Sequence, residues 1–219
     1  MFRSKRLHRY ALNIKKLSLE TVWIEACDIE KTIKEVGGKP TDTRPDGSPK
    51  YTLPAIQDPN TSQVVVCSFE IIDYFGKIYP ETPTLLGNTT ALQKGSLEAF
   101  RTEVLLPTAP LWLDEYALKL NEPSKQFWSE RPTQYPYPSE EELPNVMVRS
   151  QKGFEEVASW YPDGSLAGGD TPIYVDIFIA SDLQCIRWVH GLESEVWKAF
   201  SQWQGGRWEA LLEYMKQYE

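Results

Sequence analysis

Apolar residues recur at spacings of three and four over residues 3–17, where Leu7, Ala11 and Ile14 share one face, and this periodicity predicts a helix. The next segment, LETVWIE over residues 19–25, is an apolar run without a breaker, so it predicts a strand. We therefore expect the chain to open with a helix that is followed by a strand.

Turn residues divide the next part of the chain. Asp28 can cap a short helix that ends at Gly37-Gly38, and the turn-rich loop GKPTDTRPDGSPK follows it. The segments YTLPAIQD and SQVVVC, separated by a short turn, predict a hairpin. Ser68 then opens a helix with an apolar stripe, so the first 80 residues are expected to form helix, strand, helix, hairpin and helix.

Only helical periodicity follows the Pro-containing linker YPETPTLLGN. The segment 172–189 is the most apolar helix and carries apolar side chains on nearly every side, which predicts burial all round. Two tryptophan-bearing helices are expected over 194–203 and 206–218. We therefore expect an α/β unit over residues 1–82 and an all-helical unit over residues 89–219.

Composition and charge limit the classes of function. With 23 Lys and Arg against 31 Asp and Glu, the formal net charge of -8 disfavours nucleic acid as a partner. No apolar run reaches the ~18 residues of a membrane helix, and no apolar segment of a signal peptide follows the basic N-terminus. Cys27, Cys67 and Cys185 form no disulfide framework or metal cluster, and His8 and His190 are the only histidines. We expect a cytoplasmic protein with no metal ion, membrane or nucleic-acid partner.

Pro54 lies inside the first strand of the expected hairpin, where a proline removes a ladder hydrogen bond. One interpretation is an edge strand or a bulge. The other is a cis peptide bond between Leu53 and Pro54, which would turn the main chain of Leu53 outward to pair with an extended peptide ligand.

Cys67 and Ser68 stand where the second strand of this hairpin gives way to a helix. Ser68 can be a simple N-cap. A helix N-terminus also offers free N–H groups and the positive end of the helix dipole to a carboxylate. Both features lie at one end of a small sheet, so they could hold the backbone and a carboxylate of the same small peptide.

The stretch YTLPAIQDPNTSQVVVCSFEIIDYFGKIYPETPTL resembles the glutathione-binding half of a glutathione transferase. The chain is most similar to fungal members related to bacterial lignin β-etherases, and RYALNIKKLSLETVWIE, GDTPIYVDIFIASDL and GRWEALLEYMKQYE fit the same pattern in order. The resemblance covers nearly the whole chain. It implies a thioredoxin-like N-terminal domain, an all-helical C-terminal domain and glutathione as co-substrate.

The resemblance also implies a set of glutathione-binding residues, namely Thr52, Leu53, Pro54, Cys67 and Ser68. Leu53 would pair with the cysteinyl part of glutathione through its main chain, and Ser68 would take the γ-glutamyl carboxylate. Family members usually carry Asp or Glu at the position of Cys67, so one charge-assisted contact is lost here. The alternative is that Cys67 is only a small buried apolar residue.

Family members begin with a strand and a catalytic loop, and this chain starts about where their first helix begins. We expect the first strand to be missing, with MFRSKR in place of the catalytic loop. Ser4 is the only hydroxyl there, and it could donate a hydrogen bond to a thiolate or cap the helix. A truncated or mis-started coding sequence is a further possibility.

A capping box of the family is also altered. Ile173 occupies the Ser position three residues before Asp176, and Thr171 followed by Pro172 offers a substitute cap. We expect Asp176 to lie inside the helix and to bond to the preceding loop.

The expected activity is transfer of glutathione to a small electrophilic metabolite, aromatic or ether, or its removal from an adduct. The resemblance implies a role in detoxification or secondary metabolism, and a homodimer. An aromatic cluster either packs loops or forms an acceptor pocket: Trp112, Tyr116, Phe127, Trp128, Tyr135 and Tyr137. The alternative function is a non-catalytic protein on the same fold that binds ligands or acts as a pathway partner.

Overall fold

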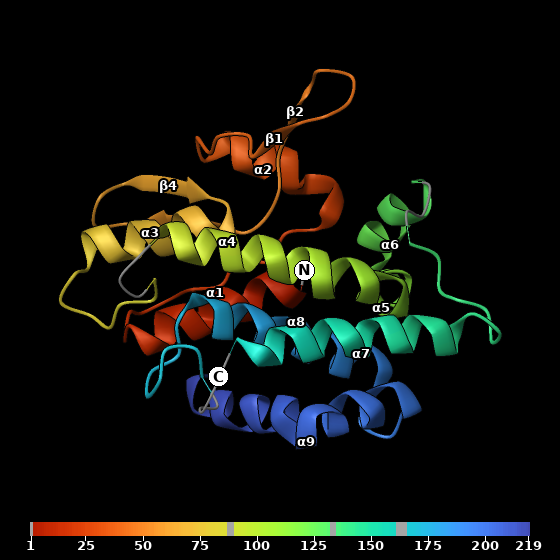
Figure 1. The fold of residues 1–219 in the computed structure, drawn as a ribbon. Helices are drawn as coiled ribbons and strands as arrows, with labels where there is room; N and C mark the ends of the chain where they lie inside the picture. The colour runs from red at the N-terminus through yellow and green to blue at the C-terminus, as the bar shows by residue number, and fades with distance from the viewer. Residues whose placement is uncertain (1, 87–89, 132–134, 161–165) are drawn as a thin grey trace.

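The computed structural model describes residues 2–86, 90–131, 135–160 and 166–219, with the side chains of residues 2–6 and 90 excluded. Small strands and helices of the first part precede a larger helical part (Figure 1). The elements of the first part are α1 (Phe2–Ile14), η1 (Ala26–Asp28), α2 (Ile29–Glu35), β1 (Asp42–Thr43), β2 (Pro49–Lys50), β3 (Ala55–Asp58), β4 (Gln63–Val66) and α3 (Ser68–Ile78).

Helices make up the described remainder of the chain. They are α4 (Thr90–Phe100), the π-helical turn η2 (Arg101–Leu105), α5 (Leu106–Leu118), α6 (Glu122–Ser129), α7 (Leu143–Ser159), α8 (Tyr174–His190), α9 (Glu195–Met215) and the 3-10 turn η3 (Lys216–Tyr218). This arrangement confirms the predicted fold, in which the described strands come first and an all-helical part follows. None of the described helices is both long and apolar enough to cross a bilayer.

The strand predicted over residues 19–25 is wrong, because this segment has no strand assignment. A strand needs a neighbouring backbone to bond with, and β3 pairs only with β4 among the described residues. Val22 and Trp23 are accordingly 75% and 64% exposed, although their apolar character is typical of a covered strand. Among the described residues, the segment 19–25 has no strand to pair with, so it stays outside the sheet although it is apolar.

Two antiparallel hairpins carry the described strands. The β3–β4 hairpin places Ala55 opposite Val66 and Asp58 opposite Gln63, which confirms the hairpin predicted there. The β1–β2 hairpin, with Thr43 opposite Pro49, lies inside the segment predicted only as a loop. Figure 1 shows the β1–β2 hairpin projecting beyond the body of the molecule.

Helix α8 lies at the centre of the larger helical part. It packs against α1, α4, α5 and α9, which explains why it is apolar on nearly all sides. Ile177, Ala180 and Leu183 are fully buried, so the predicted burial all round is confirmed. The two predicted terminal helices are also confirmed, because the backbone of α9 leaves helical geometry over residues 203–206.

Candidate functional site

The turn before β3 and the start of α3 lie side by side. The Leu53-Pro54 peptide bond is cis, which confirms the second of the two interpretations of Pro54. The backbone N–H of Cys67 donates to the carbonyl oxygen of Pro54 at 3.1 Å, so the hairpin joins the two segments directly. The residues predicted from the two segments are all half-buried: Thr52, Leu53, Pro54, Cys67 and Ser68.

Cys67 has a backbone φ of 82°, in the left-handed region that few residues other than glycine adopt. It holds the N-cap position of α3 and makes no side-chain capping bond, so the prediction of Ser68 as the N-cap is wrong by one residue. The first bond of the helix runs from the N–H of Ile71 to the carbonyl of Cys67. The N–H groups of Ser68, Phe69 and Glu70 therefore precede that bond and point out of the helix start.

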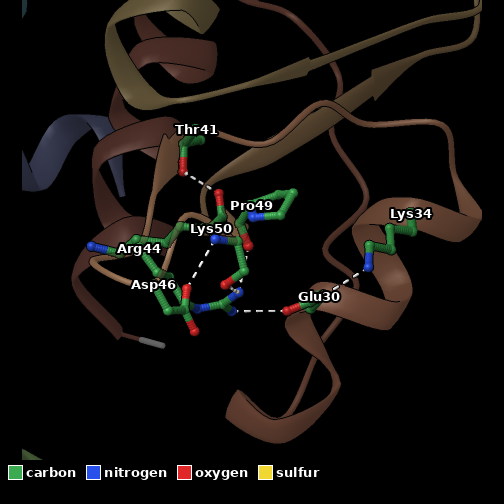
Figure 2. A network of polar contacts seen from close by, with 8 residues as sticks. Glu30, Lys34, Thr41, Arg44, Asp46, Pro49 and Lys50 are labelled. Carbon is green, nitrogen blue, oxygen red and sulfur yellow. Dashed lines mark hydrogen bonds and ion pairs between the residues drawn. The ribbon is translucent and has the colours of Figure 1, made fainter.

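Figure 2 shows the polar contacts that tie the β1–β2 hairpin to α2. The guanidinium of Arg44 binds the carboxylate of Glu30 at 2.8 Å, and the ammonium of Lys34 binds the same carboxylate at 2.7 Å. The hydrogen bond from Lys34 and then that from Arg44 lower the pKa of Glu30. The hydroxyl of Thr41 reaches the hydroxyl of Thr52 at 2.9 Å, so this network extends to the residue before Leu53.

Helix α6 fastens the first part of the chain to the helical part. The amide of Asn121 donates to the carboxylate of Glu25 at 2.8 Å, and the hydroxyl of Ser124 also donates to that carboxylate. The N–H of Ala26 donates to the Ser124 hydroxyl at 2.8 Å. The hydrogen bond from Asn121, and next that from Ser124, lower the pKa of Glu25. Sequence reasoning missed α6, although Asn121 followed by Glu-Pro is a helix-start signal.

The predicted aromatic cluster is spread over three places. Trp112 and Tyr116 are buried in the helical core with ring centroids 6.3 Å apart. Phe127 packs on the apolar cluster that includes Leu53. Tyr137 lies beside the His190 ring, with centroids 6.3 Å apart. A hollow of about 10 Å³ lies between the two parts of the chain and is lined by Ile24, Ala26, Ile29, Tyr116, Leu120, Ser124 and Trp128.

Ser4 lies in the first turns of α1, but its side chain is outside the described residues. Because the helix begins at Phe2, the interpretation of Ser4 as an N-cap is wrong. The other interpretation, in which the Ser4 hydroxyl donates a hydrogen bond to a thiolate, stays a prediction. Within the described residues, no three His, Cys, Asp or Glu side chains gather in a group that could hold a metal ion.

We expect Ser124→Ala to lower the free energy of unfolding by about 1–2 kcal/mol, because the buried N–H of Ala26 loses its acceptor. Urea unfolding measures this loss, and hydrogen exchange should show faster opening of α6. Ser129→Ala at the end of the same helix is the control, because its exposed hydroxyl donates to the Gln126 carbonyl of that helix. Equal stability of the two variants would contradict the role of Ser124.

Comparisons with known proteins agree with this geometry. Residues 91–218 match the family model for the glutathione S-transferase C-terminal domain. The chain is similar to a glutathione S-transferase of Ceriporiopsis subvermispora, solved in complex with glutathione, with 32% identity, a TM-score of 0.92 and coverage of 99% of this chain and 91% of that one. No curated protein matches the chain.

A second solved relative supports the same assignment. A glutathione transferase from Phanerochaete chrysosporium is 29% identical with a TM-score of 0.85, and the match covers 99% of this chain and 90% of that one. The family model spans more than half of the chain, and the structural match extends over nearly all of it. The chain therefore belongs to the glutathione S-transferase family.

Proposed function

We propose that the chain binds glutathione at the Leu53-Pro54 turn and transfers it to, or removes it from, a small electrophilic metabolite, aromatic or ether. The observation that carries the proposal is the bond from the Cys67 N–H to the Pro54 carbonyl, which sets this turn against the start of α3. The similar protein of Ceriporiopsis subvermispora was solved with glutathione. We propose residues 1–82 as the glutathione-binding domain and 89–219 as the helical domain.

Leu53 offers its main chain to the ligand. It makes no hydrogen bond within the described residues, so both its N–H and its carbonyl are available to pair with the cysteinyl unit of glutathione. Its side chain packs in the apolar cluster that also holds Phe127, so the backbone is held in place from behind. This pairing would hold the cysteinyl sulfur at a fixed distance from the turn.

The γ-glutamyl end would lie at the start of α3. The free N–H groups of Ser68 and Phe69, together with the Ser68 hydroxyl, suit its carboxylate, and the positive end of the helix dipole adds to the attraction. The γ-glutamyl ammonium would lie near Cys67, whose thiol carries no opposing charge. We therefore expect the wild-type chain to bind glutathione weakly.

Chemistry follows from holding the thiol beside the acceptor. The glutathione thiolate attacks the electrophilic carbon, a new carbon–sulfur bond forms, and the leaving group departs with its electron pair. We propose Ser4 as the donor that stabilises the thiolate, which lowers the pKa of the thiol. The acceptor would approach beside Trp128, which is 40% exposed, because the hollow of about 10 Å³ behind it is too small to hold such a molecule.

We expect Cys67→Asp to tighten glutathione binding about tenfold or more, because it adds a charge-assisted contact to the ammonium worth ~1.5–3 kcal/mol. Calorimetry on the full chain measures the change. Cys67→Asn is the matched control, since it keeps the shape without the charge; equal affinities of the two variants would contradict the assigned contact.

Turnover distinguishes the transferase from the non-catalytic alternative. We expect the wild type to release chloride from a chloronitrobenzene in the presence of glutathione, with a lower rate in Ser4→Ala and unchanged glutathione affinity. Binding without turnover would support the ligand-binding alternative, and absence of binding in both the wild type and Cys67→Asp would contradict the proposed site. We also propose a cytoplasmic homodimer, which sedimentation can test.

A further inference from the structure

The stretch 51–53, which leads into the Leu53-Pro54 turn, is held in place by its side chains. Within the part of the chain that the structure describes, none of its three residues donates or accepts a hydrogen bond through its backbone. Their side chains instead contact η1, α2 or the residue before β1. The main chain of Leu53 is therefore fixed by its surroundings while its own polar groups stay open to a ligand.

The side chain of Thr52 is held by Thr41, the residue before β1. The two hydroxyl oxygens lie 2.9 Å apart. Thr41 is itself fixed, because its N–H donates to the Lys50 carbonyl at 2.8 Å and its hydroxyl donates to the same oxygen at 3.2 Å (Figure 2). Since the Thr41 hydrogen is engaged by that carbonyl, the Thr52 hydroxyl is the donor and the Thr41 hydroxyl its acceptor.

Helix α2 anchors both the hairpin that carries Thr41 and the residue before Thr52. The guanidinium of Arg44 binds the Glu30 carboxylate at 2.8 Å, as Figure 2 shows. The ammonium of Lys34 binds the same carboxylate at 2.7 Å and lies 5.0 Å from the centre of the Tyr51 ring. One helix thus holds the two segments whose hydroxyls meet, so their relative position is set before any ligand binds.

We propose that Thr41 is a positioning residue for glutathione, which acts through Thr52 on the main chain of Leu53. This inference rests on the proposed function, in which Leu53 pairs with the cysteinyl unit of the ligand. Without the bond between the two hydroxyls, the stretch 51–53 would adopt further conformations. Glutathione would then bind only the fraction of molecules in which the Leu53 backbone is correctly placed, so its apparent affinity would fall.

Calorimetry of glutathione binding tests the proposal, on the wild-type chain and on Cys67→Asp. In both backgrounds we expect Thr41→Val, which keeps the shape of the side chain and removes the acceptor, to weaken binding about fivefold. Thr41→Ser keeps the hydroxyl and should stay within about twofold of its background. Thr43→Val on β1 is the matched control, because the Thr43 side chain is exposed and its hydroxyl makes no hydrogen bond within the described residues.

A double-mutant cycle separates positioning from a direct contact between Thr52 and the ligand. If Thr52 acts as the partner of Thr41, then Thr52→Val and the double variant should each show about the same fivefold loss as Thr41→Val. If Thr52 instead touches glutathione independently of Thr41, the losses should multiply to about twenty-five-fold in the double variant. Hydrogen exchange without ligand should also be faster over residues 51–53 in Thr41→Val and unchanged in Thr43→Val.

The outcomes distinguish this inference from the proposed function. Equal glutathione affinities of Thr41→Val and its background would overturn the role of Thr41 and leave the proposed function intact. Multiplying losses in the double variant, or equal weakening in Thr43→Val, would overturn it in the same way. Absence of glutathione binding in both the wild type and Cys67→Asp would contradict the proposed function and this inference with it. Thr41→Ala replaces Thr41→Val in each comparison if the valine variant does not fold.

Discussion

Replacing Asp176 with alanine is expected to lower the free energy of unfolding by about 2–4 kcal/mol, because three backbone N–H groups lose the carboxylate that accepts from them. The Asp176 carboxylate is fully buried at the first turn of α8. It accepts from the N–H of Ala167 at 2.7 Å, of Ile173 at 3.0 Å and of Gly168 at 3.3 Å. One side chain thus holds the preceding loop against the central helix.

The same carboxylate makes stability depend on pH. Burial raises the pKa of Asp176 to about 6, and the three N–H donors oppose this only in part. A pKa that is higher in the folded state means that the folded chain binds the proton more tightly, so this stabilisation is complete below about pH 4 and is lost as the pH rises through 6. We expect the wild type to lose about 2 kcal/mol relative to Asp176→Asn between pH 4 and pH 7.

Chemical unfolding at several pH values measures both effects. Asp170→Ala is the matched control, because its side chain lies exposed in the same loop and its backbone carbonyl, which the substitution keeps, accepts from the Tyr214 hydroxyl. We expect this control to stay within about 0.5 kcal/mol of the wild type. If Asp176→Ala is as stable as Asp170→Ala, the loop is not held by this carboxylate.

Replacing Gly153 with alanine is expected to cost about 3 kcal/mol, the upper end of what overpacking costs. The added Cβ would lie 1.8 Å from the carbonyl oxygen and 2.8 Å from the carbonyl carbon of Glu103. Backbone atoms cannot turn aside as a flexible side chain does, so α7 and η2 would have to separate. Alanine gains about 1 kcal/mol in helix propensity over glycine, which is too little to offset this.

Gly95→Ala provides the matched control for Gly153→Ala. Gly95 is also a helix-interior glycine, in α4, and a Cβ built there meets nothing within 4 Å. We expect Gly95→Ala to raise the melting temperature, because only the gain of about 1 kcal/mol in helix propensity remains. We expect the two substitutions to change the stability of the protein in opposite directions. A stabilising Gly153→Ala would contradict this expectation and show that α7 and η2 can separate at little cost in free energy.

Local patterns determined the elements whose partners lie close in the chain. The β3–β4 hairpin and the start of α3 are contiguous, so the sequence alone was enough to bring Leu53 and Pro54 near Cys67 and Ser68. The all-round apolar character of α8 likewise determined its burial, because a helix without a polar face has no side to offer to water.

Tertiary structure decided the features that depend on distant partners. The apolar segment 19–25 is not a strand, because strand pairing is a property of two segments and no described strand bonds to it. Glu25 meets Ser124 only because α6 folds back over η1, and nothing in either segment specifies the other. The close approach of Gly153 to the backbone of Glu103 likewise joins two residues that no sequence periodicity relates, so only the packing of α7 against η2 creates it.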